Sequence, residues 1–364
     1  MDRRSFLKKA GLTAGGAATV AAASFPTPAI TQERRELKMV TTWPKNFPGL
    51  GTGAQRLADR ITALTDGRIT VQVFGAGELV PPFESFDAVS QGTADLYHAA
   101  DYYWLGKHPA YAFFTAVPLG LTYAEHSAWI NFGGGQELWD ELGSQFNIKS
   151  LLCGNTGTQM AGWFKKEVTG LDDLKGLKFR MPGLGGELMR QIGVNVINLP
   201  GGEIFPALQS GAIDGADWVG PWNDLAFGLY KAAKYYYYPN MSEGGAALAF
   251  GINKGVWDGL SATDQEVLKA ASAAENSMLY ADFNANNARS LNTLVSDHEV
   301  IVAPLPADII DALGKAAPDV LASAATDDIG KRIHDAYLKT RDEFRSWTQI
   351  AEPAYVGDRA RVLG

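Results

Sequence analysis

The hydrophobic positions of this chain recur with two different periods, which alternate from its first hundred residues onward. Short apolar or alternating stretches predict strands at 36–43, 68–74 and 94–99. Between them, apolar residues spaced by three and four positions predict helices at 51–64 and 82–91. The order strand, helix, strand, helix, strand is typical of a parallel sheet covered by helices. The sequence therefore predicts an α/β fold.

The chain is predicted to pass between two lobes at least twice. A length of 364 residues favours two lobes, and 46% hydrophobic residues suffice for a core in each. After a helix near 124–142 and an apolar strand at 148–153, the chain crosses at 159–166, and a strand at 246–252 returns. We therefore expect discontinuous domains: 30–158 with 244–260 for lobe one, 159–243 for lobe two, and 261–364 for bracing helices.

The last third of the chain contains one unusually long helical pattern. It begins after an N-cap at Ser261 and continues without proline or glycine to about Ser296. At 1.5 Å per residue, such a helix is about 50 Å long, which exceeds what one small lobe needs. Its apolar face must cover either both lobes of its own chain or a partner molecule.

Two segments about thirty residues apart carry the most specific chemistry. In 174–182, a short strand is stopped by a Met-Pro-Gly turn, and Arg180 stands at its end. In 207–218, a helix and a short strand are followed by Asp217 and Trp218. Ligands bind at the carboxyl ends of strands in open α/β sheets. The sequence therefore makes Arg180 the leading ligand-binding candidate, with a surface salt bridge as the alternative.

The first 29 residues are predicted to be a twin-arginine signal peptide. Arg3 and Arg4 are followed by Phe-Leu-Lys, by a stretch of small residues at 10–23, and by a Thr-Pro-Ala cleavage site ending at Ala29. The small-residue stretch is too short and too glycine-rich for a stable membrane anchor. We expect export to the periplasm and a mature protein that starts near Ile30.

The charge of the chain is acidic, which argues against binding to nucleic acid. The signal peptide carries four basic residues and one acidic residue, so its removal changes the formal charge from −8 to −11. An anionic ligand would then have to be bound by a local positive group. Arg180 is the residue placed to provide it.

The sequence lacks the usual parts of an enzyme site. The five histidines are dispersed, and no nucleophile elbow, SxxK motif or Walker A lysine is present. The single cysteine, Cys153, lies in an apolar strand and is predicted to be a core residue without a chemical role. The glycine clusters at 133–135 and 183–186 are interpreted as tight turns into helices. We therefore predict a protein that is not an enzyme.

The segments 174–182 and 207–218, in this order and spacing, resemble the DctP-type solute-binding proteins of tripartite ATP-independent periplasmic (TRAP) transporters. The resemblance extends from about Leu37 to the C-terminal helices. It implies a two-lobed periplasmic solute-binding fold with a hinge cleft and a long C-terminal helix. Within the family, the combination of Gln159, Arg180, Asp217-Trp218 and Glu243 is similar to the branch that binds 2-oxoacids.

The resemblance also implies roles for individual residues. Arg180 would bind the ligand's carboxylate through its planar guanidinium fork. The substrate-binding set comprises Arg180, Asn155, Gln159, Trp218, Tyr102 and Tyr103, and either tyrosine can be the one that faces the ligand. A hard cation, sodium or alternatively calcium, would be held by oxygen atoms of Gln159, Asp217, Trp218 (backbone carbonyl) and Glu243.

The function that follows is an extracytoplasmic receptor. The resemblance implies that it binds a small monocarboxylate, a 2-oxoacid such as pyruvate or 2-oxobutyrate, and delivers it to the membrane permease subunits of a TRAP transporter. In the branch that this sequence resembles, the long helix forms homodimers, and we expect a homodimer here. Two alternatives use the same fold: a periplasmic metal-assisted enzyme acting on a small organic acid, and a sensor subunit.

Overall fold

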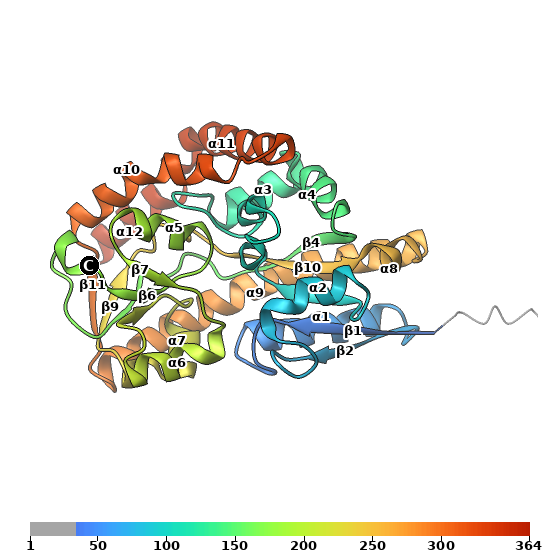
Figure 1. Cartoon of the computed structure of the whole chain (residues 1–364), viewed down its shortest axis with the longest axis horizontal. Coiled ribbons are helices and arrows are strands. Elements are labelled where there is room, and N and C mark those ends of the chain that lie inside the picture. Colours follow the sequence, from blue (N-terminus) through green and yellow to red (C-terminus); the bar gives the residue numbers. More distant parts are fainter. Residues whose placement is uncertain (1–33) are drawn as a thin grey trace, which may run out of the picture. The chain divides into compact units, whose positions relative to one another are not determined.

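The computed structural model describes residues 34–364, which form a mixed α/β structure with two separate sheets (Figure 1). The α/β class predicted from the sequence is confirmed. The predicted twin-arginine signal peptide lies outside the described residues. No helix within residues 34–364 is both long enough and apolar enough to span a bilayer.

The first sheet has five strands in the order β2-β1-β3-β10-β4. The predicted βαβαβ opening is confirmed, since β1 pairs in parallel with both β2 and β3. The returning strand β10 is inserted antiparallel between β3 and β4. The strands and their connecting helices are β1 (Arg35–Thr41), α1 (Leu50–Leu64), β2 (Ile69–Phe74), η1 (Pro82–Glu84), α2 (Ser85–Ser90), β3 (Leu96–Ala99), β4 (Ile148–Asn155) and β10 (Ala247–Asn253).

The second sheet has six strands in the order β11-β9-β5-β8-β6-β7. It consists of β5 (Gly162–Phe164), β6 (Lys178–Arg180), β7 (Asn195–Ile197), β8 (Gly215–Ala216), β9 (Tyr235–Tyr238) and β11 (Ile301–Pro304). Helices α5 (Gly183–Gln191), α6 (Gly201–Ser210) and α7 (Pro221–Phe227) connect or follow its strands. The edge strand β11, a short stretch after the long helix, was not predicted. It belongs to the sheet only through its parallel pairing with β9, which the local sequence does not reveal.

One helix expected near 124–142 is two helices. The structure has α3 (Tyr123–Phe132) and α4 (Gly135–Ser144), separated by two glycines. Gly134 has φ of +81°, a left-handed conformation that a continuous helix does not contain. The glycine cluster is thus a turn into α4, as predicted.

The long helix α9 (Ala262–Ser296) is confirmed at 35 residues, with the Ser261 side chain capping its first turn. In Figure 1 it runs from the first sheet toward the second, and it packs on β4, α1 and α7. The chain ends with α10 (Ala307–Ser323), α11 (Asp328–Thr348) and α12 (Glu352–Leu363). Within the described chain, α9 therefore braces elements of both sheets, and its role in a dimer stays a prediction.

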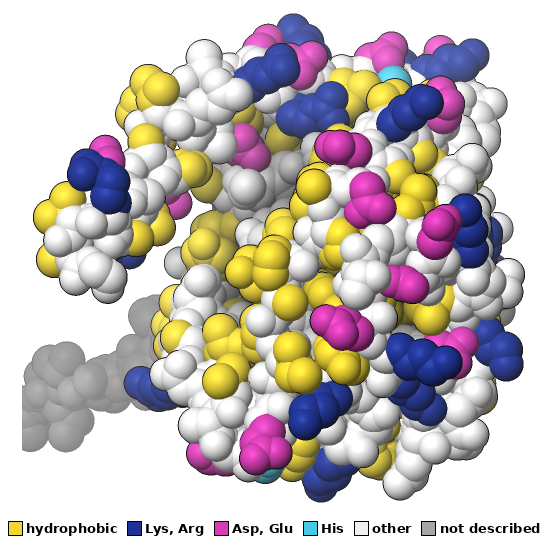
Figure 2. Space-filling model, turned by 90° about the vertical axis from the view of Figure 1, so that its left-hand side faces the viewer, with side chains coloured by type: hydrophobic (Ala, Val, Ile, Leu, Met, Phe, Trp, Pro, Cys, Tyr) yellow, Lys and Arg dark blue, Asp and Glu magenta, His cyan; other side chains and the backbone are white. Residues whose placement is uncertain are grey.

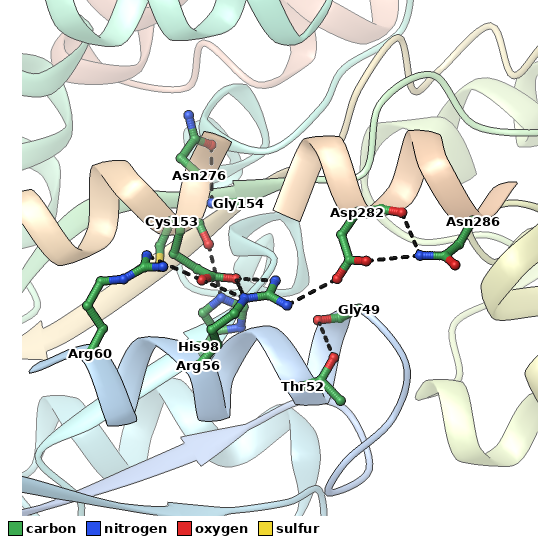
Figure 3. A network of polar contacts seen from close by, with 11 residues as sticks. Gly49, Thr52, Arg56, Arg60, His98, Cys153, Gly154, Asn276, Asp282 and Asn286 are labelled. Carbon is green, nitrogen blue, oxygen red and sulfur yellow. Dashed lines mark hydrogen bonds and ion pairs between the residues drawn. The ribbon is translucent and has the colours of Figure 1, made fainter. Parts of the chain in front are cut away.

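Polar side chains fix α9 to the first sheet (Figure 3). Arg56 of α1 pairs with the fully buried Glu275 at 2.6 Å and with Asp282 at 3.1 Å. The residue that follows Glu275 in α9 is Asn276, whose side chain accepts a hydrogen bond from the Gly154 amide at 3.2 Å. Gly154 lies in β4, so this network joins α9 to the strand that ends at the predicted ligand-binding residue Asn155.

Candidate ligand and cation site

Arg180 lies at the end of β6, between β8 and β7, and is fully buried. Its Nη1 donates to the Asp217 carbonyl at 2.7 Å, and its Nε donates to the Leu199 carbonyl at 3.1 Å. Its Nη2 has no partner within residues 34–364, although it is buried. The alternative of a surface salt bridge is therefore wrong. Since Nε is occupied, the guanidinium presents its Nη2 end to a ligand.

Two buried carboxylates flank this guanidinium. Asp217 Oδ2 lies 3.4 Å from Arg180 Nη1, and Asp217 Oδ1 accepts a hydrogen bond from the side-chain amide of Asn240 at 3.1 Å. Burial raises the pKa of Asp217 to about 8, against the opposing effect of Arg180. Burial and the charge of Asp217 raise the pKa of Glu243 well above its usual range, and Arg180 again opposes the shift. The three ionisable groups thus influence one another within one buried site.

Gln159 and Glu243 are joined through their backbones. The backbone N–H of Gln159 donates to the Glu243 carbonyl at 3.1 Å, and the backbone carbonyl of Gln159 accepts from the backbone N–H of Asn240 at 3.1 Å. Gln159 Oε1 and Glu243 Oε2 are buried and have no hydrogen-bond partner among the described residues. Buried polar atoms without a partner are costly, so these oxygens are suited to a ligand or cation.

Tyr102 and Tyr103 approach the site from the first sheet. They lie in η2 (Asp101–Trp104), which follows β3, and Tyr102 packs against Gly183 at the start of α5. Burial raises the pKa of both tyrosines, and Arg180 opposes both shifts, so both lie close to that charge. Tyr102 is buried and Tyr103 is partly exposed. Which of the two faces the ligand stays a prediction.

Trp218 completes one wall of the site. The Arg180 guanidinium lies over its ring, 5.3 Å from the ring centroid, so the two side chains make a favourable cation–π contact. The ring packs on Gly201, where an added Cβ would come within 2.3 Å of it. Trp218 is buried, and its indole Nε1 has no partner in the described chain.

Asn155 is the one predicted ligand-binding residue without a described contact to this group. It ends β4, and its side-chain oxygen accepts from the Gly157 amide at 2.8 Å. Within residues 34–364 it makes no hydrogen bond to Arg180, Asp217 or Glu243. Its role toward a ligand therefore stays a prediction.

Sequence reasoning missed two residues of this region. Asn240 joins Asp217 to Gln159, and Asp224 of α7 holds the backbone of the loop after β8 at Val219 and Gly220. Neither residue belongs to a motif. The partners of Asn240 are distant in sequence, whereas the amides that Asp224 holds lie just before it in the chain. The only available signal was their position, Asn240 after a Tyr-Pro turn and Asp224 in the first turn of a helix.

The donor atoms of the site fit a hard cation. Gln159, Asp217, Glu243 and the Trp218 carbonyl supply oxygen, the donor that sodium and calcium prefer. Only two of the four are carboxylates. In keeping with this, no group of three or more His, Cys, Asp or Glu suited to a metal occurs among residues 34–364.

Comparison with known families decides the assignment. Residues 39–327 match the DctP family, described as bacterial extracellular solute-binding protein, family 7. This chain belongs to the DctP family of TRAP-transporter solute-binding proteins. The family predicted from the two segments around Arg180 and Asp217 is confirmed.

Relatives of this family member are similar over nearly their whole length. A monocarboxylate 2-oxoacid-binding periplasmic protein of Nostoc is 38% identical over 358 residues, which is 98% of each chain. A TRAP solute-binding protein from Bordetella bronchiseptica, solved as a dimer with calcium and picolinate, has a TM-score of 0.89 at 33% identity, covering 91% of this chain and 98% of its own. One from Pseudoalteromonas atlantica with sodium and pyruvate has a TM-score of 0.86 at 35% identity, covering 89% and 99%.

Proposed function

We propose that this protein is a periplasmic receptor that binds a small 2-oxoacid, such as pyruvate or 2-oxobutyrate, together with one cation. It delivers the acid to the membrane permease subunits of a TRAP transporter and makes or breaks no bond. The observation that carries the proposal is the buried group of Arg180, Asp217 and Glu243, with unpartnered atoms on Arg180 and Glu243.

The charge of the site supports a cation. One guanidinium and two carboxylates give a formal charge of −1 when both carboxyl groups are ionised, and a bound monocarboxylate would make it −2. Burying such an excess charge is strongly unfavourable, and the raised pKa values of Asp217 and Glu243 reflect that cost, which a cation beside both carboxyl groups would offset. A sodium ion would reduce the excess to −1, and a calcium ion would remove it. Either ion therefore permits an anionic ligand in a site that already holds two carboxylates.

The donor atoms of the site divide into one group for the ligand's carboxylate and one for the cation. Arg180 Nη2 binds the ligand's carboxylate, while Gln159 Oε1, Glu243 Oε2, Asp217 and the Trp218 carbonyl hold the cation. A 2-oxoacid offers a keto oxygen beside its carboxylate, so it can complete the coordination of the same ion. Succinate, which has no such oxygen, would lose this contact.

The C-terminal end of the chain supports a homodimer. Trp347 is 69% exposed, Ile350 is 69% exposed and Tyr355 is 66% exposed. Trp347 lies near the end of α11, Ile350 follows that helix, and Tyr355 lies in α12. Trp347 also lines a cavity of about 470 Å³ together with Tyr123 and Tyr280. Figure 2 faces this side and shows hydrophobic side chains both on a projecting arm and on the body beside it. Sedimentation of the purified protein should give a dimer, and a monomer would contradict this assignment.

The test of the function is calorimetric titration with pyruvate, 2-oxobutyrate and succinate, in metal-free buffer and with added sodium or calcium. We expect stoichiometric binding of the 2-oxoacids that tightens with the cation, and no product. In the Glu243→Ala variant both affinities should fall together, because cation and ligand complete each other's binding. Turnover of a 2-oxoacid would contradict a receptor, and equal affinity in metal-free buffer would contradict the cation.

A further inference from the structure

Asp224 is a buried carboxylate that is in neither the proposed substrate-binding set nor the proposed cation-binding set. It contacts the loop after β8, which carries two of the proposed cation donors, Asp217 and the Trp218 carbonyl. It lies in α7 and is 1% exposed. Its Oδ1 accepts hydrogen bonds from the backbone amides of Val219 at 3.2 Å and Gly220 at 3.1 Å. Its Oδ2 accepts from the Tyr236 hydroxyl at 2.6 Å and from Trp163 Nε1 at 2.9 Å. The side chain thus ties this loop to the second sheet.

The backbone groups of the loop are nearly all in use. The Asp217 amide donates to the Arg180 carbonyl at 3.0 Å, and the Asp217 carbonyl accepts from Arg180 Nη1 at 2.7 Å. The Val219 carbonyl accepts from the Met160 amide at 3.2 Å, directly after Gln159. Among residues 34–364, no hydrogen bond reaches the Trp218 carbonyl. This carbonyl is therefore the acceptor of the loop that is left for an added group.

The direction of the Trp218 carbonyl follows from the amide that Asp224 holds. In a trans peptide the N–H and the preceding C=O point in opposite directions within one plane. The N–H of Val219 points to Asp224, so the carbonyl of Trp218 points away from Asp224 and from the Tyr236 and Trp163 side chains behind it. Rotation of this peptide plane would break the bond to Asp224.

We propose that Asp224 is a positioning residue, which fixes the Trp218 carbonyl in the direction that a bound cation requires and thereby sets how tightly the site holds that cation. The inference rests on the proposed function, because it assumes a cation beside the ligand. A carboxylate that orients a ligand atom without touching the ion is a common arrangement at metal sites.

The test is calorimetric titration of calcium into the purified protein at a fixed, saturating concentration of pyruvate. For Asp224→Ala we expect calcium affinity to fall by at least about tenfold, the scale seen when an orienting partner is lost at a metal site. At saturating calcium, the pyruvate affinity of this variant should return to within about twofold of the wild-type value, because occupancy of the cation site restores the ligand's second anchor. A variant that is merely misfolded would not be rescued in this way.

Two further variants separate position from charge and from stability. Tyr236→Phe removes the 2.6 Å bond on Oδ2 and leaves both backbone amides held, so it should lower the melting temperature without changing calcium affinity. Asp224→Glu keeps the charge but displaces the carboxylate by one methylene, so it should lose calcium affinity as Asp224→Ala does. If Asp224→Ala does not fold, the Glu variant carries the test.

The outcomes distinguish the inference from the function on which it rests. If the wild-type protein binds calcium and Asp224→Ala binds it equally well, the inference is wrong and the receptor function stands. The inference also fails if Tyr236→Phe loses as much calcium affinity, or if Asp224→Glu loses none. If the wild-type protein binds no cation with any 2-oxoacid, the proposed site is wrong, and the inference falls with it.

Discussion

At the scale of single residues, Arg180 shows how a charge is prepared for a ligand. Two backbone carbonyls fix its orientation through Nη1 and Nε, and the Trp218 ring lies against its face, while Nη2 remains without a partner in the described chain. The side chain is therefore held rigidly before any ligand binds. A preorganised group loses little conformational entropy when it binds.

Replacing Arg180 with lysine should weaken ligand binding although the positive charge is kept. A lysine ammonium cannot hold the carbonyls of Leu199 and Asp217 and also reach a ligand in the guanidinium's plane. We expect a loss of about 1.5 to 3 kcal/mol, the scale of a hydrogen bond to a charged group. Calorimetric titration with pyruvate at saturating calcium measures it. Unchanged affinity would remove Arg180 from the ligand site.

Two buried histidines should make the protein sensitive to acid. Burial lowers the pKa of His98 and of His126 from 6.5 to about 4. At pH values between about 4 and 6.5, each of these histidines is protonated in the unfolded chain but not in the folded chain. The free energy of unfolding therefore falls as the pH falls through this range. The slope is about 1.4 kcal/mol per pH unit for each histidine.

The measurement is the free energy of unfolding by urea at several pH values from 4.5 to 7. A variant with glutamine at both positions should show a shallower loss of stability toward acid than the wild-type protein. Parallel curves for the two proteins would show that these imidazoles are not held neutral by the fold.

At the scale of elements, the sequence predicted what depends on local pattern. The βαβαβ order, the capped helix from Ser261 and the strand that ends at Arg180 follow from periodicity and turn residues nearby in the chain. The pairing of β11 with β9 does not, because it joins residues more than sixty positions apart. For the same reason Asn240 was missed, since its partners Asp217 and Gln159 are close to it only after folding. Asp224 was missed because its bonds to nearby backbone amides leave no motif in the sequence.

Gly201, the first residue of α6, lies against the Trp218 ring and so helps to set the position of that ring in the site. An alanine Cβ there would lie 2.3 to 2.8 Å from the Trp218 ring, so the ring must leave its present position beside the Arg180 guanidinium. We expect Gly201→Ala to lower pyruvate affinity roughly tenfold, an effect of about 1.4 kcal/mol.

The neighbouring glycine provides a matched control for this prediction. Gly202 lies in the same helical turn and has no atom within 4 Å of an added Cβ. Gly202→Ala should therefore bind pyruvate as the wild-type protein does. Equal binding by both variants would show that the position of Trp218 does not matter for the ligand.

The contact between α1 and α9 should stabilise the first sheet. Burial raises the pKa of Glu275, and Arg56 opposes that shift through hydrogen bonds of 2.6 to 3.1 Å. Among the described residues, Arg56→Ala would leave this fully buried carboxylate with Arg60 as its one cationic partner, at 3.6 Å. Because Arg56 is about one-third exposed, we expect a loss of about 2 to 3 kcal/mol in the free energy of unfolding, below the value for a fully buried pair.

A surface ion pair serves as the control for Arg56. Arg332 pairs with Glu141 at 2.6 and 2.7 Å, but both side chains are about half exposed. Arg332→Ala should cost less than about 1 kcal/mol, the usual range for exposed pairs. Urea denaturation of the two variants compares them directly, and equal losses would mean that burial of Glu275 adds nothing.

At the scale of the whole described chain, the site is enclosed from both sheets. Phe47, just before α1, stacks on Phe227 at the end of α7, with ring centroids 4.2 Å apart. Nearby, the Asn223 amide donates to the Pro48 carbonyl at 2.9 Å. Across the site, Tyr102 covers the start of α5. Such contacts fit a receptor that closes around its ligand, and the division into two hinged lobes stays a prediction.

The most direct test of the central claim is a crystal structure of the purified protein grown with pyruvate and calcium. We predict one pyruvate with its carboxylate on Arg180 Nη2, and one calcium ion bound by Gln159 Oε1, Asp217, the Trp218 carbonyl and Glu243 Oε2. The keto oxygen of pyruvate should complete the coordination of the ion. Pyruvate bound elsewhere, or bound at Arg180 with no ion beside Glu243, would contradict the account.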